Sequence, residues 1–201
     1  MIAWSIHAAL EAEVFDAVLV TTDDEEIASI AEKEGAVVPF LRPSQLSGDH
    51  APTMPVLVHA IDWWQSNRHP IDYACCIYAT APFVRREILS QAIQMLQEGD
   101  ADFVLSVARF EYPVQRSLRL DGFGMLNFAE PGNALKRSQD LEPRYHDAGQ
   151  FFAGRKDSFR HYEAALFGRC QPIVIPSDEA VDIDTEEDWR IAEKLFLAKE
   201  R

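Results

Sequence analysis

The sequence predicts one α/β domain in which helices cover a mostly parallel sheet and an antiparallel insertion interrupts the pattern. Short apolar runs rich in β-branched residues alternate with amphipathic stretches, which is typical of strand–helix repeats. Between residues 111 and 152 this alternation gives way to a polar, turn-rich segment, which we interpret as the insertion. The 201 residues suffice for one domain, and 47% hydrophobic with 26% charged residues is typical of a folded globular chain.

Helices are expected where apolar residues recur at helical spacing, and strands where a short run is apolar throughout. The expected helices span residues 1–13, 24–34, 55–67, 85–98, 156–167 and 185–199. The expected strands span residues 16–22, 36–40, 73–78, 102–108 and 173–175. Inside the insertion, residues 118–120 and 125–128 flank the turn sequence Asp121-Gly-Phe-Gly124 and are expected to form a hairpin. Thr185 and Asp188 have the spacing of a capping box for the last helix.

Charge and cysteine usage limit the partners and the compartment. A net charge of -14 repels nucleic acid and anionic lipid, so an anion must bind at a local group of basic side chains or backbone N–H groups. No apolar run approaches the ~20 residues of a membrane-spanning helix, and no secretory signal is recognisable. Cys75 and Cys76 are adjacent in an apolar run, and with Cys170 they fit neither a disulfide framework nor a zinc site. We therefore expect a cytoplasmic protein with no nucleic-acid or membrane partner.

The sequence Val181-Asp-Ile-Asp184 is the strongest candidate for a chemical site. Residues two apart on an extended segment point the same way, so Asp182 and Asp184 place two carboxylates on one side. Such a pair suits Mg²⁺, which keeps several waters and takes further ligands from phosphate. The alternative is that Asp184 caps the following helix and Asp182 is a solvated loop residue.

Other polar groups are weaker candidates. Thr22-Asp-Asp-Glu-Glu26 lies where a strand meets a helix, and we favour an N-cap over a ligand site there. The loop from Arg42 to Thr53 could hold a base or a phosphate, or be an ordinary surface loop. The basic pairs Arg85–Arg86 and Lys136–Arg137 are candidate anion sites. His146 could act as an acid or base, although a single histidine is more often structural.

An ordered set of motifs extends over nearly the whole chain. The motifs are Met1-Ile-Ala-Trp-Ser-Ile6, Thr21-Thr-Asp-Asp24, Phe40-Leu-Arg-Pro43 with Leu46, Ser47 and Asp49, Ile77-Tyr-Ala-Thr-Ala-Pro82, Asp147-Ala-Gly-Gln-Phe151 and Val181-Asp-Ile-Asp-Thr-Glu-Glu-Asp-Trp189. As a set they resemble the CMP-sialic acid synthetase (acylneuraminate cytidylyltransferase) family, and within it the pseudaminic acid cytidylyltransferase branch. N-acetylneuraminate enzymes of this family typically have Gln at the position of Tyr78.

The resemblance implies a fold, a reaction and partners. The fold would be a three-layer, Rossmann-like nucleotidyltransferase, with residues 111–152 protruding to make a homodimer. The reaction would join CTP and an acidic nine-carbon sugar into a CMP-sugar with release of pyrophosphate, in the presence of Mg²⁺. The product would serve cell-surface or flagellin glycosylation.

The resemblance also implies roles for individual residues. Asp182 and Asp184 would hold the metal ion. The remaining matches are Arg42, Ala51 and Thr53 on the nucleotide, Tyr78 and Thr80 in the sugar pocket, and Arg137, Gln150 and Phe152 on the sugar-binding side of the insertion. No residue is a certain catalytic base, and His146 is the weak candidate.

One feature of the family is missing from this sequence. The family begins with a strand and a loop rich in Gly, Arg and Lys that cradles the triphosphate, and this segment would precede Met1. We therefore expect an N-terminally truncated domain, with the absent strand belonging between residues 18–22 and 74–78. The alternatives are a synthetase for CMP-N-acetylneuraminate or CMP-legionaminate, or a non-catalytic homologue without the phosphate loop.

Overall fold

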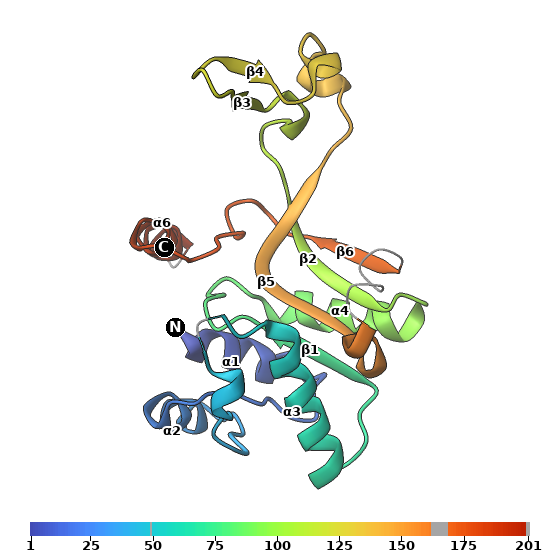
Figure 1. Cartoon of the computed structure of the whole chain (residues 1–201). Coiled ribbons are helices and arrows are strands. Elements are labelled where there is room, and N and C mark those ends of the chain that lie inside the picture. Colours follow the sequence, from blue (N-terminus) through green and yellow to red (C-terminus); the bar gives the residue numbers. More distant parts are fainter. Residues whose placement is uncertain (49, 162–168, 200–201) are drawn as a thin grey trace.

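The computed structural model describes residues 1–48, 50–161 and 169–199, which form a body with a protruding arm (Figure 1). The body contains a four-stranded sheet, and the arm contains a two-stranded one. In the part of the chain described, no helix is long and apolar enough to cross a bilayer.

The sheet of the body is mixed, with most strands pointing the same way. Its order is β1 (Tyr73–Ile77), β5 (Tyr145–Arg155), β2 (Phe103–Arg109) and β6 (Cys170–Val174). β2 and β6 are parallel, whereas β5 lies antiparallel between β1 and β2. β1, β2 and β6 therefore share one direction, as the predicted α/β class requires. β5 falls partly inside the predicted insertion and was not expected in this sheet.

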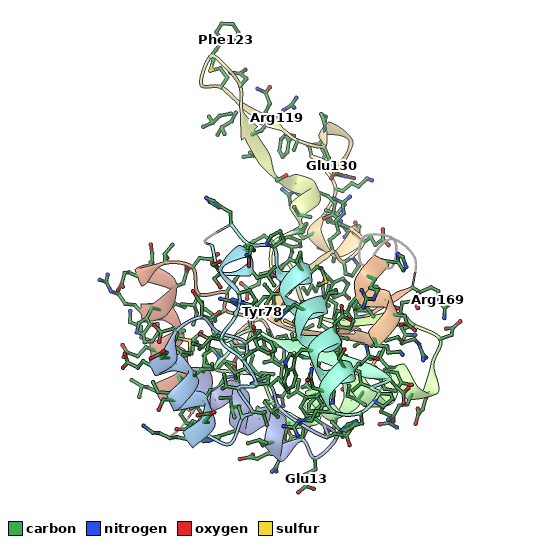
Figure 2. All side chains as sticks on the ribbon, turned by 60° about the horizontal axis from the view of Figure 1, so that its bottom comes forward. Glu13, Tyr78, Arg119, Phe123, Glu130 and Arg169 are labelled. Atoms are coloured by element: carbon green, nitrogen blue, oxygen red, sulfur yellow. The ribbon has the colours of Figure 1, made fainter. Side chains whose placement is uncertain are left out.

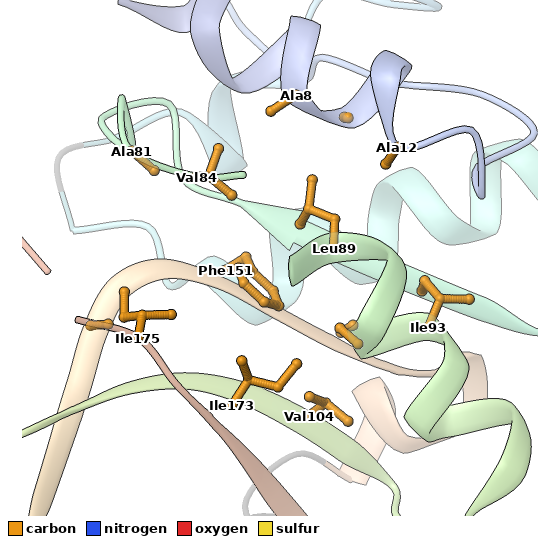
Figure 3. Close-up of a cluster of buried hydrophobic side chains, with 14 of the residues drawn as sticks. Ala8, Ala12, Ala81, Val84, Leu89, Ile93, Val104, Phe151, Ile173 and Ile175 are labelled. Atoms are coloured by element: carbon orange, nitrogen blue, oxygen red, sulfur yellow. The ribbon is translucent and has the colours of Figure 1, made fainter. Parts of the chain in front are cut away.

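Helices cover both faces of the sheet because successive strand residues point to opposite faces. On one face, Val104 and Phe151 pack against α1 (Ile2–Glu11) and α4 (Arg86–Glu98) (Figure 3). The neighbouring residues of the same strands, Phe103 and Phe152, face the other side. There they pack with Phe159 and with Ile61 of α3, so this face of the sheet is covered as well. This confirms the three-layer arrangement.

A bulge in β5 divides its pairing with β2. The register shifts between Leu105 and Val107, so Ser106 faces Phe151 without a regular ladder partner. The buried Ser106 hydroxyl fills the gap, because it donates to the Phe151 carbonyl at 2.8 Å and accepts from the Phe151 N–H at 3.1 Å. Beyond the bulge, β2 and β5 continue together toward the arm.

The two strands predicted at residues 16–22 and 36–40 are wrong as strands. These segments meet only in single parallel bridges, Leu19 with Val37 and Thr22 with Leu41. Pro39 lies between the two bridges and lacks the N–H that a continuous ladder would need. The predicted helix between them forms as α2 (Glu25–Lys33).

The other predicted helices form close to their expected bounds. They are α1, α3 (Thr53–Asn67), α4 and α6 (Glu186–Lys199). The helix expected at 156–167 differs, because Lys156–His161 is a 3-10 turn and residues 162–168 lie outside the described part of the chain.

The arm carries the predicted hairpin, with β3 (Leu118–Leu120) paired antiparallel to β4 (Leu126–Phe128). Its tip at Phe123 extends far from the body (Figure 2).

Candidate functional site

The candidate site lies at the sheet edge where β1, β2 and β6 have their carboxyl ends. Ligands of α/β sheets bind at such edges. Tyr78 follows β1 there, and its N–H donates to the carbonyl of Gln150 in β5 at 2.9 Å. The Tyr78 carbonyl accepts from the hydroxyl of Ser5 in α1 at 3.0 Å, which ties the first helix to this edge. The loop that follows β6 carries Asp182 and Asp184.

Asp182 lies directly against β5 at Gly149. The backbone of Gly149 has φ +64°, in the left-handed region that favours glycine. A Cβ at this position would lie 3.1 Å from both Cγ and Oδ1 of Asp182. The conformation and the missing side chain of Gly149 together allow the close approach of the carboxylate.

The charge around Asp182 is strongly negative. Partial desolvation raises the pKa of Asp182, and repulsion from Asp184, Asp147 and Asp188 raises it further. A carboxylate in such a field is stabilised by a cation. Within the described residues, no group of three or more ligand side chains forms a closed metal cage. Two carboxylates fit Mg²⁺, which needs only one or two from the protein when phosphate supplies other ligands.

The helix cap after Asp184 is formed by other residues. The Thr185 hydroxyl accepts from the Asp188 N–H at 3.2 Å, and the Asp188 carboxylate accepts from the Thr185 N–H at 2.8 Å. This confirms the predicted capping box of α6. The cap thus relies on Thr185 and Asp188, and the alternative in which Asp184 caps the helix is not the arrangement found.

Arg42 is held in place before any ligand arrives. Its Nη2 donates to Asp23 Oδ1 at 2.9 Å, and its Nε donates to the Ser47 hydroxyl at 3.4 Å. Asp24, next to Asp23, accepts from the N–H groups of Glu26 and Ile27 and is the N-cap of α2. This confirms the favoured cap interpretation of the acidic run.

The remaining residues predicted on the nucleotide and the sugar lie in several environments. Ala51 closes a turn onto the Gly48 carbonyl at 2.8 Å, and Thr53 is the exposed first residue of α3. Thr80 is exposed in the turn after β1. Their roles stay predictions.

Gln150 and Phe152 are more deeply buried than residues of an open pocket. Only 3% of Gln150 is exposed, and its Nε2 donates to the carbonyl of Glu179 at 2.6 Å. Phe152 belongs to the core under α3, with its ring centroid 6.3 Å from that of Tyr78. The structure thus brings Tyr78, Gln150 and Asp182 to one edge, while Phe152 supports them from below.

Arg137 lies in the arm, and His146 lies near the start of β5, close to where that strand enters the arm. Arg137 forms a two-fold ion pair with Asp140 at 2.8 and 3.0 Å. His146 packs on Phe110 with ring centroids 4.9 Å apart. Its Nδ1 lies 2.7 Å from the Asp147 carbonyl oxygen. A cavity of about 240 Å³ lies at the base of the arm, and none of the predicted site residues lines it.

Two residues near Asp182 were not predicted from the sequence. Asp147 adds negative charge beside Asp182, and the Glu179 carbonyl ties the loop that carries Asp182 to Gln150 of β5. Asp147 opens the motif Asp147-Ala-Gly-Gln-Phe151, but nothing in the sequence indicates that it lies near Asp182.

Known cytidylyltransferases resemble this chain over most of its length. A family model described as cytidylyltransferase matches residues 1–151. The chain is 36% identical over 196 residues to a pseudaminic acid cytidylyltransferase of Campylobacter jejuni subsp. jejuni serotype O:2, covering 98% of this chain and 84% of the relative. It is 26% identical to a CMP-N,N'-diacetyllegionaminic acid synthase of Legionella pneumophila, covering 98% and 84%.

The fold has a counterpart among solved structures. A CMP:2-keto-3-deoxy-manno-octonic acid synthetase complexed with CTP superposes with a TM-score of 0.67 at 14% identity, covering 98% of this chain and 88% of that one. This likeness confirms the α/β nucleotidyltransferase fold. Because the family model matches most of the chain and a close relative aligns over nearly all of it, the chain belongs to the cytidylyltransferase family of nucleotidyltransferases.

Proposed function

We propose that this chain transfers a cytidylyl group from CTP to a sialic-acid-like nonulosonate, with pseudaminic acid as the favoured substrate. The observation that carries the sugar assignment is the 36% identity to the Campylobacter jejuni relative over 98% of the chain. A legionaminate substrate is the second candidate, supported by the more distant Legionella pneumophila relative at 26% identity.

The chemical step is an in-line displacement at phosphorus. The anomeric hydroxyl gives up its proton to water, its oxygen forms a bond to the α-phosphorus of CTP, the bond from that phosphorus to the bridging oxygen breaks, and pyrophosphate leaves. An enzyme assists such a step mainly by positioning and by neutralising charge. In this chain, Arg42 would orient the nucleotide, and Tyr78 and Thr80 would line the sugar pocket.

Asp182 and Asp184 would hold Mg²⁺ at this edge. When bound, Mg²⁺ supplies positive charge to phosphate oxygens and lowers the pKa of the attacking hydroxyl. The repulsion that raises the pKa of Asp182 supports this assignment, because a divalent cation would relieve it. No described residue stands out as the acceptor of the hydroxyl proton in place of water. His146 is the weak candidate for this role, and His146→Gln tests it.

The test is pyrophosphate release by the full chain with CTP, Mg²⁺ and one sugar at a time. We expect pseudaminic acid to exceed the blank without sugar and to exceed N-acetylneuraminic and legionaminic acids. Asp182→Asn should abolish release without changing the circular dichroism spectrum. Equal turnover of the variant and the parent would exclude the metal assignment. A higher turnover of another sugar would make that sugar the assigned substrate in place of pseudaminic acid.

We also infer a homodimer formed through the arm. Leu118 pairs with Phe128 and Leu120 with Leu126, so the hairpin has one apolar face, on which all four side chains are exposed. A two-stranded hairpin is marginal in water on its own. A second copy presents an identical face, which fits a two-fold interface.

Sedimentation velocity tests the dimer. Leu120→Lys combined with Leu126→Lys should give a monomer with an unchanged body. Arg119→Gln is the matched control, because Arg119 lies on the opposite face of the same strand. A parent protein that stays monomeric at high concentration would rule out the dimer.

The state of the thiols supports a proposal about the compartment. Cys75, Cys76 and Cys170 are all free cysteines, and burial raises the pKa of Cys76 to about 12. Unreactive, unpaired thiols suit a reducing compartment, and we propose the cytoplasm.

A further inference from the structure

The loop carrying Asp182 and Asp184 has an anchor three residues before Asp182. The side chain of Glu179 is only 14% exposed and lies between two cations. Its carboxylate forms an ion pair with Arg85 Nε at 3.2 Å and accepts a hydrogen bond from Lys199 Nζ at 2.9 Å. Arg85 precedes α4 and Lys199 ends α6, so one carboxylate joins the loop to two separate helices.

The backbone of Glu179 makes a third connection. Its carbonyl accepts from the buried Gln150 Nε2 at 2.6 Å, and Gln150 is the neighbour of Gly149, against which Asp182 packs. The loop is therefore fixed to β5 at both Glu179 and Asp182.

The far end of α6 is also packed on the body. The Phe196 ring lies 4.9 Å from that of Trp4 and 6.1 Å from that of Phe83. Lys199 lies over the Phe83 ring at 5.7 Å and pairs with Asp178 at 3.2 Å as well as with Glu179. The helix after the metal loop thus returns to the base of that loop.

Charge is divided unevenly along the loop. Its ion pairs in the described part of the chain all involve Asp178 or Glu179, and none involves Asp182 or Asp184. The base is therefore neutralised by Arg85 and Lys199, while the tip keeps its negative charge. Without these cations, repulsion among the acidic side chains would push the loop outward.

We propose that Glu179 is a positioning residue that holds Asp182 and Asp184 in the geometry needed to bind a divalent cation. The proposal rests on the metal site assigned under the proposed function. Glu179 does not contact the ion or the substrate, and it acts through the loop backbone.

The test measures Mn²⁺ binding to the full chain, with free Mn²⁺ followed by electron paramagnetic resonance. Glu179→Gln keeps the size of the side chain and the backbone bond to Gln150 but removes the ion pairs. Because Glu179 lies beyond the direct ligands, we expect Mn²⁺ affinity to fall by about tenfold, the low end for residues that orient metal ligands. The matched control is Glu87→Gln, which removes a carboxylate paired with Arg86 on the surface at 2.9 Å and should bind Mn²⁺ like the parent.

Two further variants make the outcome decisive. Asp182→Asn should abolish the site, and Lys199→Met, which leaves the pair between Arg85 and Glu179, should weaken binding by less than Glu179→Gln does. The Lys199 variant also serves if Glu179→Gln does not fold. Parental affinity in folded Glu179→Gln or, failing that, in Lys199→Met overturns the positioning role while leaving the metal site intact. A parent that binds no Mn²⁺, or an Asp182 variant that binds it like the parent, overturns the metal site and this proposal with it.

Discussion

Ser106 offers a direct test of how the sheet accommodates its bulge. Ser106 and Phe151 are both 0% exposed, and one hydroxyl satisfies both the N–H and the carbonyl of Phe151. Ser106→Ala removes both bonds and leaves two buried backbone groups without these partners. Each buried group left unpaired costs about 1 to 3 kcal/mol, so for the two groups together we expect a loss of about 2 to 6 kcal/mol in the free energy of unfolding.

Urea denaturation and thermal melting measure this loss. For a domain of this size, about 2 to 6 kcal/mol corresponds to a fall of roughly 5 to 20 °C in Tm. Ser90→Ala is the control, because the Ser90 hydroxyl also bonds two carbonyls, of Ala12 and Arg86, but is only partly buried. Its loss should be smaller. A change below about 0.5 kcal/mol for Ser106→Ala, the range of ordinary surface substitutions, would refute the reasoning.

Two other substitutions test the core and the site. Gly154→Ala would drive a methyl group into the buried Phe103 ring, so we expect a loss of about 1 to 3 kcal/mol, partly restored by adding Phe103→Leu; equal losses in the single and double variants would contradict the clash. For Asp182, the raised native pKa means that the native state binds the proton more tightly than the unfolded state, so stability falls as pH rises through the raised range. Metal-free Asp182→Asn should therefore be more stable than the parent at neutral pH, with the difference vanishing below the ordinary pKa of aspartate. Urea denaturation in a chelator measures this, and a less stable variant at neutral pH would count against the origin of the shift.

Local patterns predicted the elements whose signals are themselves local. The helical spacing of residues 55–67 and the capping box at Thr185 both correspond to what forms, because each depends on residues within a few positions. The strand at residues 36–40 failed because a strand needs a neighbour, and periodicity does not reveal whether one is available. The same limit hid β5, whose apolar residues Phe151 and Phe152 fit a central strand as well as an insertion.

The site shows the same division between local and long-range information. The spacing of Asp182 and Asp184 indicated paired carboxylates, which depends on three consecutive residues. The contacts that place them, from Gly149 and Glu179, join segments about 30 residues apart. No sequence period records such contacts, so only the family motifs had brought Gly149 into view.

The candidate site combines a cation that is already oriented, Arg42, with a carboxylate whose charge the surroundings disfavour, Asp182. Three guanidinium bonds hold Arg42, to Asp23, Ser47 and the Thr21 carbonyl, so its orientation requires little further loss of entropy when an anion binds. Asp182 is pressed against Gly149 in a field that disfavours its charge, a cost that the rest of the fold must offset. A cation bound between Asp182 and Asp184 would relieve that cost. The stability that the fold loses at this loop would then return as affinity for the cation. The anchoring proposed for Glu179 would serve this end, because a loop free to move outward would lower the repulsion without any cation.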